Sequence, residues 1–334
     1  PQPVASPRDP AMMSTRASSP LVPFAVACVG VAIFSGMDAI MKGLSITLGA
    51  YNALLWRTLT GVVLMAPLFA WKVGRLPDRS TMMLHLGRTL AGGISVLLFF
   101  WGLVRVPLAQ GIALSFIAPL IALGLAALFL RERIGRRAIL GSLIAFAGVM
   151  VILAGQSGAG GEAGTMEGAV AILVAAVLYA VNLVIGRRQS LAAGPIEVAF
   201  AFNLIGGTLF LLLAPLSEGF ARLAAQSLDL EVSALALRPE IPDMMHWPAI
   251  LLASIVGTSA IMLLSWAYAR AEAQQLVAVE YTAFIWAAML GWWVFGERVL
   301  PTTALGAAMI VAGCLWAARQ QPGRPHPNIE PEAV

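Results

Sequence analysis

Long apolar stretches, separated by short polar ones, run through most of the chain. A helix needs about 20 mostly apolar residues to cross a bilayer, and ten stretches reach about that length. They are 22–46, 50–71, 84–104, 108–130, 136–154, 167–187, 196–216, 247–269, 275–296 and 300–318. All are far longer than the roughly 10 residues of a membrane β-strand. The pattern therefore predicts an all-α membrane protein with ten transmembrane helices.

The composition agrees with a membrane protein. Hydrophobic residues make up 59% of the 334 residues and charged residues only 11%, against about 25% charged residues in soluble domains. Such a chain lacks the polar surface that a water-soluble protein needs. The two cysteines, Cys28 and Cys314, lie inside apolar stretches, so a disulfide framework is not indicated.

The polar segments predict the orientation. Residues 1–21 and 319–334 are rich in proline and polar residues and are expected to be disordered cytoplasmic tails. Basic residues gather in alternate loops, including the loop near 72–88 with Lys72, Arg75, Arg79 and Arg88. The positive-inside rule then places both termini in the cytoplasm and the loops 155–166 and 217–246 outside an inner (plasma) membrane that the chain crosses many times.

The chain also repeats itself. When residues 87–152 are shifted by 165 positions, several landmark residues coincide without a gap. The coinciding pairs are Gly92 and Gly257, Trp101 and Trp266, Arg105 and Arg270, Glu132 and Glu297, Arg133 and Arg298, Gly141 and Gly306, and Gly148 and Gly313. We expect the glycines among them to let helices approach closely. Each unit, 22–154 or 167–318, holds five predicted spans, an odd number, so the second unit is predicted to be inverted, as in many secondary transporters.

Three segments carry a resemblance to a known family. "ALSFIAPLIALGLAALFLRERIGRRAILGSLIAFAGVMVI" (113–152) and "AVEYTAFIWAAMLGWWVFGERVLPTTALGAAMIVAGCLWA" (278–317) resemble the end of an EamA domain of the drug/metabolite transporter superfamily. "LLWRTLTG" (54–61) resembles its arginine-bearing second helix. Phe284 departs from the pattern, because the first copy has Pro119 there. The resemblance implies a ten-helix carrier with a central cavity that transports amino acids, sugars, cofactors or drugs by alternating access.

Three ionisable residues lie inside the first two predicted spans, where charges are costly. Asp38 and Arg57 are each about ten residues from the centre of the intervening loop, so they are expected at similar depth. Two interpretations stay open for them: a structural ion pair, or a substrate or proton site in the cavity. Lys42 lies one helical turn beyond Asp38, and we expect it to extend to the outer interface.

The second unit places neutral residues at the matching positions. Asn182 falls opposite Asp38, and Asn203 falls opposite Arg57. Both asparagines flank a short loop at nearly equal distances, so they too are expected at one depth. They are either cavity residues or ties between neighbouring helices.

The remaining candidate cavity residues are a carboxylate and mainly aromatic side chains. They are Trp101, Ser115, Tyr179, Trp266, Glu280, Tyr281 and Trp286. Glu280, opposite Ser115 in the repeat, is a candidate for binding a substrate amine or a proton, or an unremarkable residue near cytoplasmic water. The tryptophans suit either an aromatic solute or anchoring at the lipid interface. Glu132 and Glu297 are expected to cap helices and shape tight loops.

Several chemistries have no support in the sequence. There is no G-x-x-x-x-G-K-[ST] loop and no H-E-x-x-H motif, and His85, His246 and His326 are scattered. We therefore expect no catalytic residues, metal, cofactor or nucleic-acid partner.

The expected function is a secondary carrier for small amphipathic metabolites, most of all amino acids including aromatic ones, working in export. The expected partners are the solute, the lipid bilayer and a proton as candidate coupling ion, in a monomer or weak homodimer. The alternatives are uptake of a cofactor-like solute (S-adenosylmethionine or riboflavin), an intramembrane enzyme and a channel.

Overall fold

The described chain folds into helices. A computed structural model describes residues 21–118, 121, 125, 136–156, 165–228, 237–270 and 282–318, and the regular elements in these ranges are all helical. The elements are α1 (Leu21–Lys72), α2 (Arg79–Leu103), α3 (Leu108–Ser115), α5 (Arg136–Gln156), α6 (Met166–Ala192), α7 (Pro195–Leu228), the short 3₁₀ helix η2 (Met244–His246), α8 (Trp247–Tyr268), α10 (Ala283–Phe295) and α11 (Pro301–Ala318).

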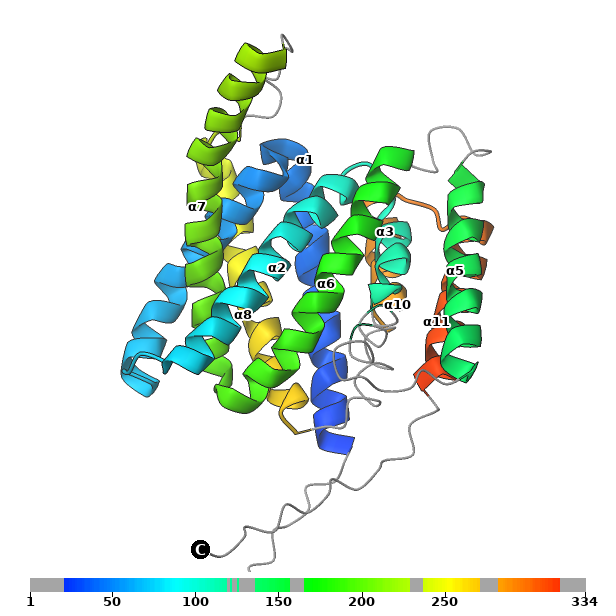
Figure 1. The fold of residues 1–334 in the computed structure, drawn as a ribbon, viewed down its shortest axis with the longest axis horizontal. Helices are drawn as coiled ribbons and strands as arrows, with labels where there is room; N and C mark the ends of the chain where they lie inside the picture. The colour runs from blue at the N-terminus through cyan, green and yellow to red at the C-terminus, as the bar shows by residue number, and fades with distance from the viewer. Residues whose placement is uncertain are drawn as a thin grey trace, which may run out of the picture.

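The helix α1 is two predicted spans joined at a sharp turn. Its backbone is non-helical at Gly49, where φ is +77° and ψ is 151°. A positive φ of this size suits glycine, which has no Cβ to clash with the backbone. The first leg therefore ascends to Gly49 and the second leg runs back, as Figure 1 shows.

Five helices of the described part are long and apolar enough to cross a membrane. They are α1, α2, α6, the part of α7 up to Glu218, and the continuous run of η2 and α8. The helices α5, α10 and α11 contain shorter apolar segments, such as Ala283–Phe295. The class of helical membrane protein follows from these lengths, because an unpaired backbone group is costly in lipid and a helix pairs its own.

Glycines bring α5 and α11 into close contact at one edge of the bundle (Figure 1). A Cβ on Gly148 would lie 2.6 Å from the carbonyl oxygen of Gly306, and a Cβ on Gly306 would lie 2.6 Å from that of Gly148. The backbones meet here because neither residue has a side chain. The predicted role of these glycines in close helix approach is confirmed.

The other large contacts join the two halves of the chain. The helix α1 packs along α8, and α2 packs along α6. The second leg of α1 also meets α7, where the Tyr51 hydroxyl donates a hydrogen bond to the Phe210 carbonyl oxygen at 2.9 Å. These pairings surround the middle of the bundle with helices from both halves.

The helix α7 differs from its predicted extent. The helix α7 continues to Leu228, through the start of the predicted outward loop at 217–246. Its extension, "SEGFARLAAQSL", holds Ala, Leu, Arg and Gln, which favour helix without requiring an apolar environment. The end of an apolar stretch therefore did not mark the end of the helix.

Candidate functional site

A central cavity of about 200 Å³ lies between the two halves of the bundle. Its lining comes from α1, α2, α3, α6 and α8, with single residues from α7 and α10. Most of the lining is apolar, and the large apolar side chains include Phe34, Met37, Phe99, Phe116 and Phe202. A cavity of this kind is the usual form of a small-molecule site, since the few polar groups in it then fix the orientation of a ligand.

Asp38 and Arg57 both line this cavity, one from each leg of α1. They are 5% and 4% exposed, respectively, and their charges interact electrostatically. In the described part of the chain, no direct hydrogen bond or ion pair joins them. Asp38 therefore faces the cavity, and no direct bond to Arg57 in the described part of the chain fixes its carboxylate.

The position of Arg57 depends on α8. The hydroxyl of Ser254 donates a hydrogen bond to the Arg57 carbonyl oxygen at 2.8 Å. A Cβ on Gly257 would lie 2.9 Å from Arg57 Nη1, so the guanidinium lies directly against the position that a side chain here would take. The Nε atom of Arg57 is buried and has no hydrogen-bond partner among the described residues. A buried donor without a partner is costly and is available to a ligand.

Arg88 is a second cavity cation, which the sequence analysis had placed in a cytoplasmic loop. Its Nε donates a hydrogen bond to Asn182 Oδ1 at 3.2 Å, and its Nη1 donates one to Gln189 Oε1. The reason lies in where α2 begins. Asp78 accepts a hydrogen bond from the backbone N–H of Ser80 at 3.1 Å and caps the helix there, so Arg88 lies more than two turns inside α2. That cap was the sequence signal that would have found it.

Three further predicted residues also line the cavity: Ser115, Tyr179 and Asn182. Asn203 does not. It is 1% exposed, and its Nδ2 donates to the carbonyl oxygen of Ala199 at 2.9 Å and to Thr258 Oγ1 at 3.3 Å. Asn203 therefore joins α7 to α8. Of the two roles that the sequence allowed, cavity residue or tie between helices, the contacts of Asn203 correspond to the second.

The predicted tryptophans lie outside the cavity lining. Trp101 is 39% exposed, and the guanidinium of Arg105 lies 3.6 Å from its ring centre. Trp266 makes the equivalent contact with Arg270, which also lies four residues later in the chain and whose guanidinium is 4.4 Å from the ring centre. These contacts stabilise each tryptophan through a cation–π interaction, and they occur at equivalent positions of the two halves.

The last aromatic candidate, Trp286, packs beside a small cluster formed by Ala27, Val31 and Ala267. The candidates Glu280 and Tyr281 lie outside the described residues.

Lys42 does not reach the outer interface as expected. It is 3% exposed, its Nζ donates to the Val106 carbonyl oxygen at 2.8 Å, and it forms an ion pair with Glu297. The other carboxylate oxygen of Glu297 accepts the backbone N–H of Leu108 at 2.7 Å. A buried ammonium requires such a partner, because unpaired charge is costly away from water.

The same contacts refine the role of Glu297. Its side chain caps α3, a helix from the first half of the chain. The residue before α3 is Pro107, which has no side-chain oxygen to accept the first helical N–H. The carboxylate from the other half of the molecule supplies that acceptor.

Known proteins place the chain in a family. The sequence profile of the EamA-like transporter family matches residues 23–154 and, a second time, residues 166–319. The chain belongs to this family. The match covers most of the chain, and membership makes this helical membrane protein a transporter.

Three named relatives are 24–30% identical to this chain. The pseudopaline exporter of Pseudomonas aeruginosa (strain UCBPP-PA14) is 24% identical over 290 residues, which are 87% of this chain and 93% of the exporter. The riboflavin transporter of Brucella anthropi is 25% identical over 80% of this chain and 87% of its own length. A probable terminal-alkyne amino-acid exporter of Streptantibioticus cattleyicolor is 30% identical over 67% of this chain and 68% of its own. All three names describe membrane transport.

A solved crystal structure shares the fold. Its TM-score with this chain is 0.57 at 21% sequence identity, and the match covers 91% of this chain and all of the other. At this identity the likeness concerns the fold alone.

Proposed function

We propose that the protein is a secondary carrier that moves small zwitterionic metabolites, above all amino acids including aromatic ones, across the inner membrane by alternating access. The observation that carries this proposal is the charge arrangement in the cavity. Asp38, Arg57 and Arg88 all line it, and charged groups inside a membrane protein usually mark a solute or ion path.

The three charges suit the two ends of an amino acid. The carboxylate of Asp38 suits an ammonium group, and the planar guanidinium of Arg57 or Arg88 suits a carboxylate through paired hydrogen bonds. The apolar walls, with Phe34 and Phe99 among them, suit an apolar side chain between these ends.

The size of the cavity favours a single small metabolite. Its volume is about 200 Å³, whereas pockets for drug-sized ligands measure about 300–1,000 Å³. In this conformation an amino acid therefore suits the cavity better than riboflavin or S-adenosylmethionine, which remain the alternative solutes for uptake.

Alternating access is supported by signs of an inverted repeat. The family profile matches twice. The first helix of each five-helix unit, 22–154 or 167–318, packs against the third predicted span of the other unit, since α1 contacts α8 and α6 contacts α2. Two equivalent units would produce such reciprocal contacts. The first residues of α1 and the last of α11 lie at the same, lower end in Figure 1. This supports ten spans with both termini in the cytoplasm.

The direction of transport is proposed as export, supported by the names of two relatives, the pseudopaline and the terminal-alkyne amino-acid exporters. The riboflavin transporter supports the uptake alternative. The transporter family gives no support to an intramembrane enzyme.

Counterflow in proteoliposomes tests the proposal. Vesicles preloaded with an unlabelled amino acid should accumulate the labelled one, and the N-acetyl and methyl-ester derivatives should fail because each lacks one charged end. Riboflavin and S-adenosylmethionine serve as the competing solutes. Saturable exchange also separates a carrier from a channel. The absence of counterflow for every amino acid tested would refute the proposal.

A further inference from the structure

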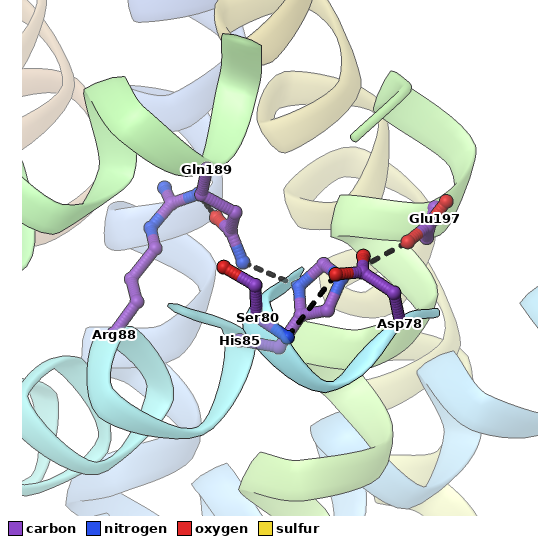
Figure 2. A network of polar contacts seen from close by, with 6 residues as sticks. All are labelled: Asp78, Ser80, His85, Arg88, Gln189 and Glu197. Atoms are coloured by element: carbon purple, nitrogen blue, oxygen red, sulfur yellow. Dashed lines mark hydrogen bonds and ion pairs between the residues drawn. The ribbon is translucent and has the colours of Figure 1, made fainter. Parts of the chain in front are cut away.

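A network of polar side chains that includes His85, Arg88, Gln189 and Glu197 lies near the start of α2 (Figure 2). His85 is fully buried. Its Nε2 lies 3.2 Å from Glu197 Oε1, and its Nδ1 lies 2.6 Å from Gln189 Nε2. Gln189 Oε1 bonds to Arg88, and Arg88 reaches Asn182 in the cavity lining. The network thus joins α2, α6 and α7.

The chemistry of these groups fixes the direction of every hydrogen bond. Arginine can only donate, so Gln189 presents its oxygen to Arg88 and its NH₂ group to His85. His85 Nδ1 must then accept, which leaves the ring proton on Nε2, where it is donated to Glu197. The observed arrangement therefore corresponds to one state of His85: neutral, with its proton on Nε2.

We propose that His85 is a proton-binding site that controls the cavity arginine, Arg88. A second proton, on Nδ1, would face the NH₂ group of Gln189, and two donors cannot bond to each other. If the Gln189 amide turns over to present its oxygen to His85, its NH₂ group faces Arg88, which has no acceptor to offer. Arg88 then loses the acceptor that Gln189 supplied to its Nη1, and this nitrogen can bind a carboxylate in the cavity.

The proposal deepens the proposed function and rests on it for the identity of the ligand, a carboxylate. It gives Gln189 the role of a positioning residue, since this side chain acts on the ligand only through Arg88. It also predicts a sign: acidification on the side of His85 increases the affinity for the solute.

The charges around His85 favour this sequence of events. From α7, Glu197 is partly exposed, and its carboxylate would form an ion pair with His85 once the ring is protonated. On α2 itself, Arg88 is repelled by a positive His85. From α6, the described charged side chain nearby is Arg188, which is exposed. From α1, Asp38 and Arg57 lie in the cavity.

The polar turn before α2 adds no buried charge. Its Arg75, Asp78 and Arg79 are all exposed, as is Lys72 at the end of α1. Glu197 is therefore the described carboxylate in contact with His85, and its negative charge favours the ring that carries both protons.

Counterflow measured against pH provides the first test. As the pH on the α2 N-terminal side falls from about 8 to about 5.5, a range that spans histidine titration, KM for the amino acid should fall about tenfold, the effect of one hydrogen bond to a charged group. His85→Asn keeps an acceptor for Gln189 but cannot gain a proton, so its KM should stay high at every pH. Gln189→Met removes the acceptor from Arg88, so its KM should stay low at every pH.

These two opposite, pH-independent results separate the proposal from a loss of folding, which would shift both variants in the same direction. His246→Gln is the matched control, because His246 lies in η2 outside the network, and it should keep the full pH response. If His85→Asn retains the pH response of the parent protein, the proposal is wrong. It is equally wrong if both variants shift KM the same way.

The second test does not depend on any solute. In a ¹⁵N spectrum of histidine-labelled protein at about pH 8, the signal that His85→Asn removes should be that of a neutral ring protonated on Nε2. A proton on Nδ1, or a charged ring, would overturn the proposal. If no amino acid is transported, the proposed function fails, and this spectrum still decides the state of His85.

Discussion

Two networks of charged side chains lie towards opposite ends of the bundle, and they are built differently. Towards the Gly49 turn, Lys42 and Glu297 form a direct ion pair and each also bonds to the backbone around α3. Towards the start of α2, His85 and Arg88 are linked through a neutral amide, Gln189. A direct ion pair holds two parts of a molecule in a fixed position. In a chain of hydrogen bonds through an amide, by contrast, one added proton can exchange the donor and acceptor sides of the amide.

The difference concerns which parts are joined. The Lys42 network links the first leg of α1 and the start of α3 to Glu297, which lies two residues after the end of α10, so it closes the two halves against each other. The His85 network runs along the cavity wall and ends on a side chain that faces the cavity. We therefore expect the first to determine the conformation and the second to determine affinity, and four variants examine this contrast.

The largest effect is expected for Glu297→Gln. The amide that this substitution introduces still offers an oxygen to the backbone of Leu108, but Lys42 loses its counter-ion. Breaking a buried ion pair by removing one charge costs about 3–5 kcal/mol, which thermal unfolding in detergent would measure. The double variant Lys42→Met with Glu297→Gln should recover most of this loss, since it leaves no unpaired charge. Equal destabilisation of the single and double variants would contradict the assignment.

Asp38→Asn should affect solute binding while leaving the fold in place. The neutral amide no longer attracts an ammonium group, so KM for a zwitterionic amino acid should rise about tenfold to a hundredfold, the range for a hydrogen bond to a charged group. A des-amino analogue should show little change, and Arg88→Gln should show the reverse preference. Counterflow with the two solutes measures both effects. Equal losses for both solutes in both variants would mean that the charges have only a structural role.

Gly257→Ala should have a moderate and specific effect. The added methyl would lie 2.9 Å from Arg57 Nη1 and 3.1 Å from Met37 Cγ, and both side chains are flexible enough to move. We expect near-parental thermal stability with a severalfold higher KM, because the Arg57 guanidinium is displaced. Gly36→Ala is the matched control, since nothing lies within 4 Å of a Cβ there. A KM that is unchanged in Gly257→Ala would remove Arg57 from the solute site.

The smallest effect is expected at Asp78. Its hydrogen bond with Thr81, and others with nearby backbone, lower the pKa of this carboxyl below its ordinary value of 3.8. A carboxyl whose pKa is lowered by folding stabilises the fold fully at pH values above its ordinary pKa of 3.8. This contribution is lost as the pH falls through the lower pKa of the folded state. Asp78→Ala should therefore reduce the melting temperature slightly at neutral pH and leave it unchanged at a pH well below 3.8. A difference that persists in acid would show that the cap does not act through its charge.

Much of the fold could be predicted because it depends on local properties. The length of an apolar stretch reports whether a helix can span the hydrocarbon layer, and the glycines of the repeat, Gly148 and Gly306 among them, indicated close helix approach. Asp38 was recognised as a candidate only because a charged side chain inside a membrane span has a high free-energy cost. The sequence left the role of the tryptophans open, because aromatic side chains suit both a cavity and a lipid interface.

The sequence by itself determined the helical membrane class and the resemblance to the family, because apolar length and spacing are written along the chain. Only the tertiary structure decided what each polar side chain meets. Lys42 found its partner 255 positions away in Glu297, and Arg88 faces the cavity because α2 begins at Arg79 and packs along α6. Such contacts depend on how helices distant in sequence are rotated against each other, and no local pattern records that rotation.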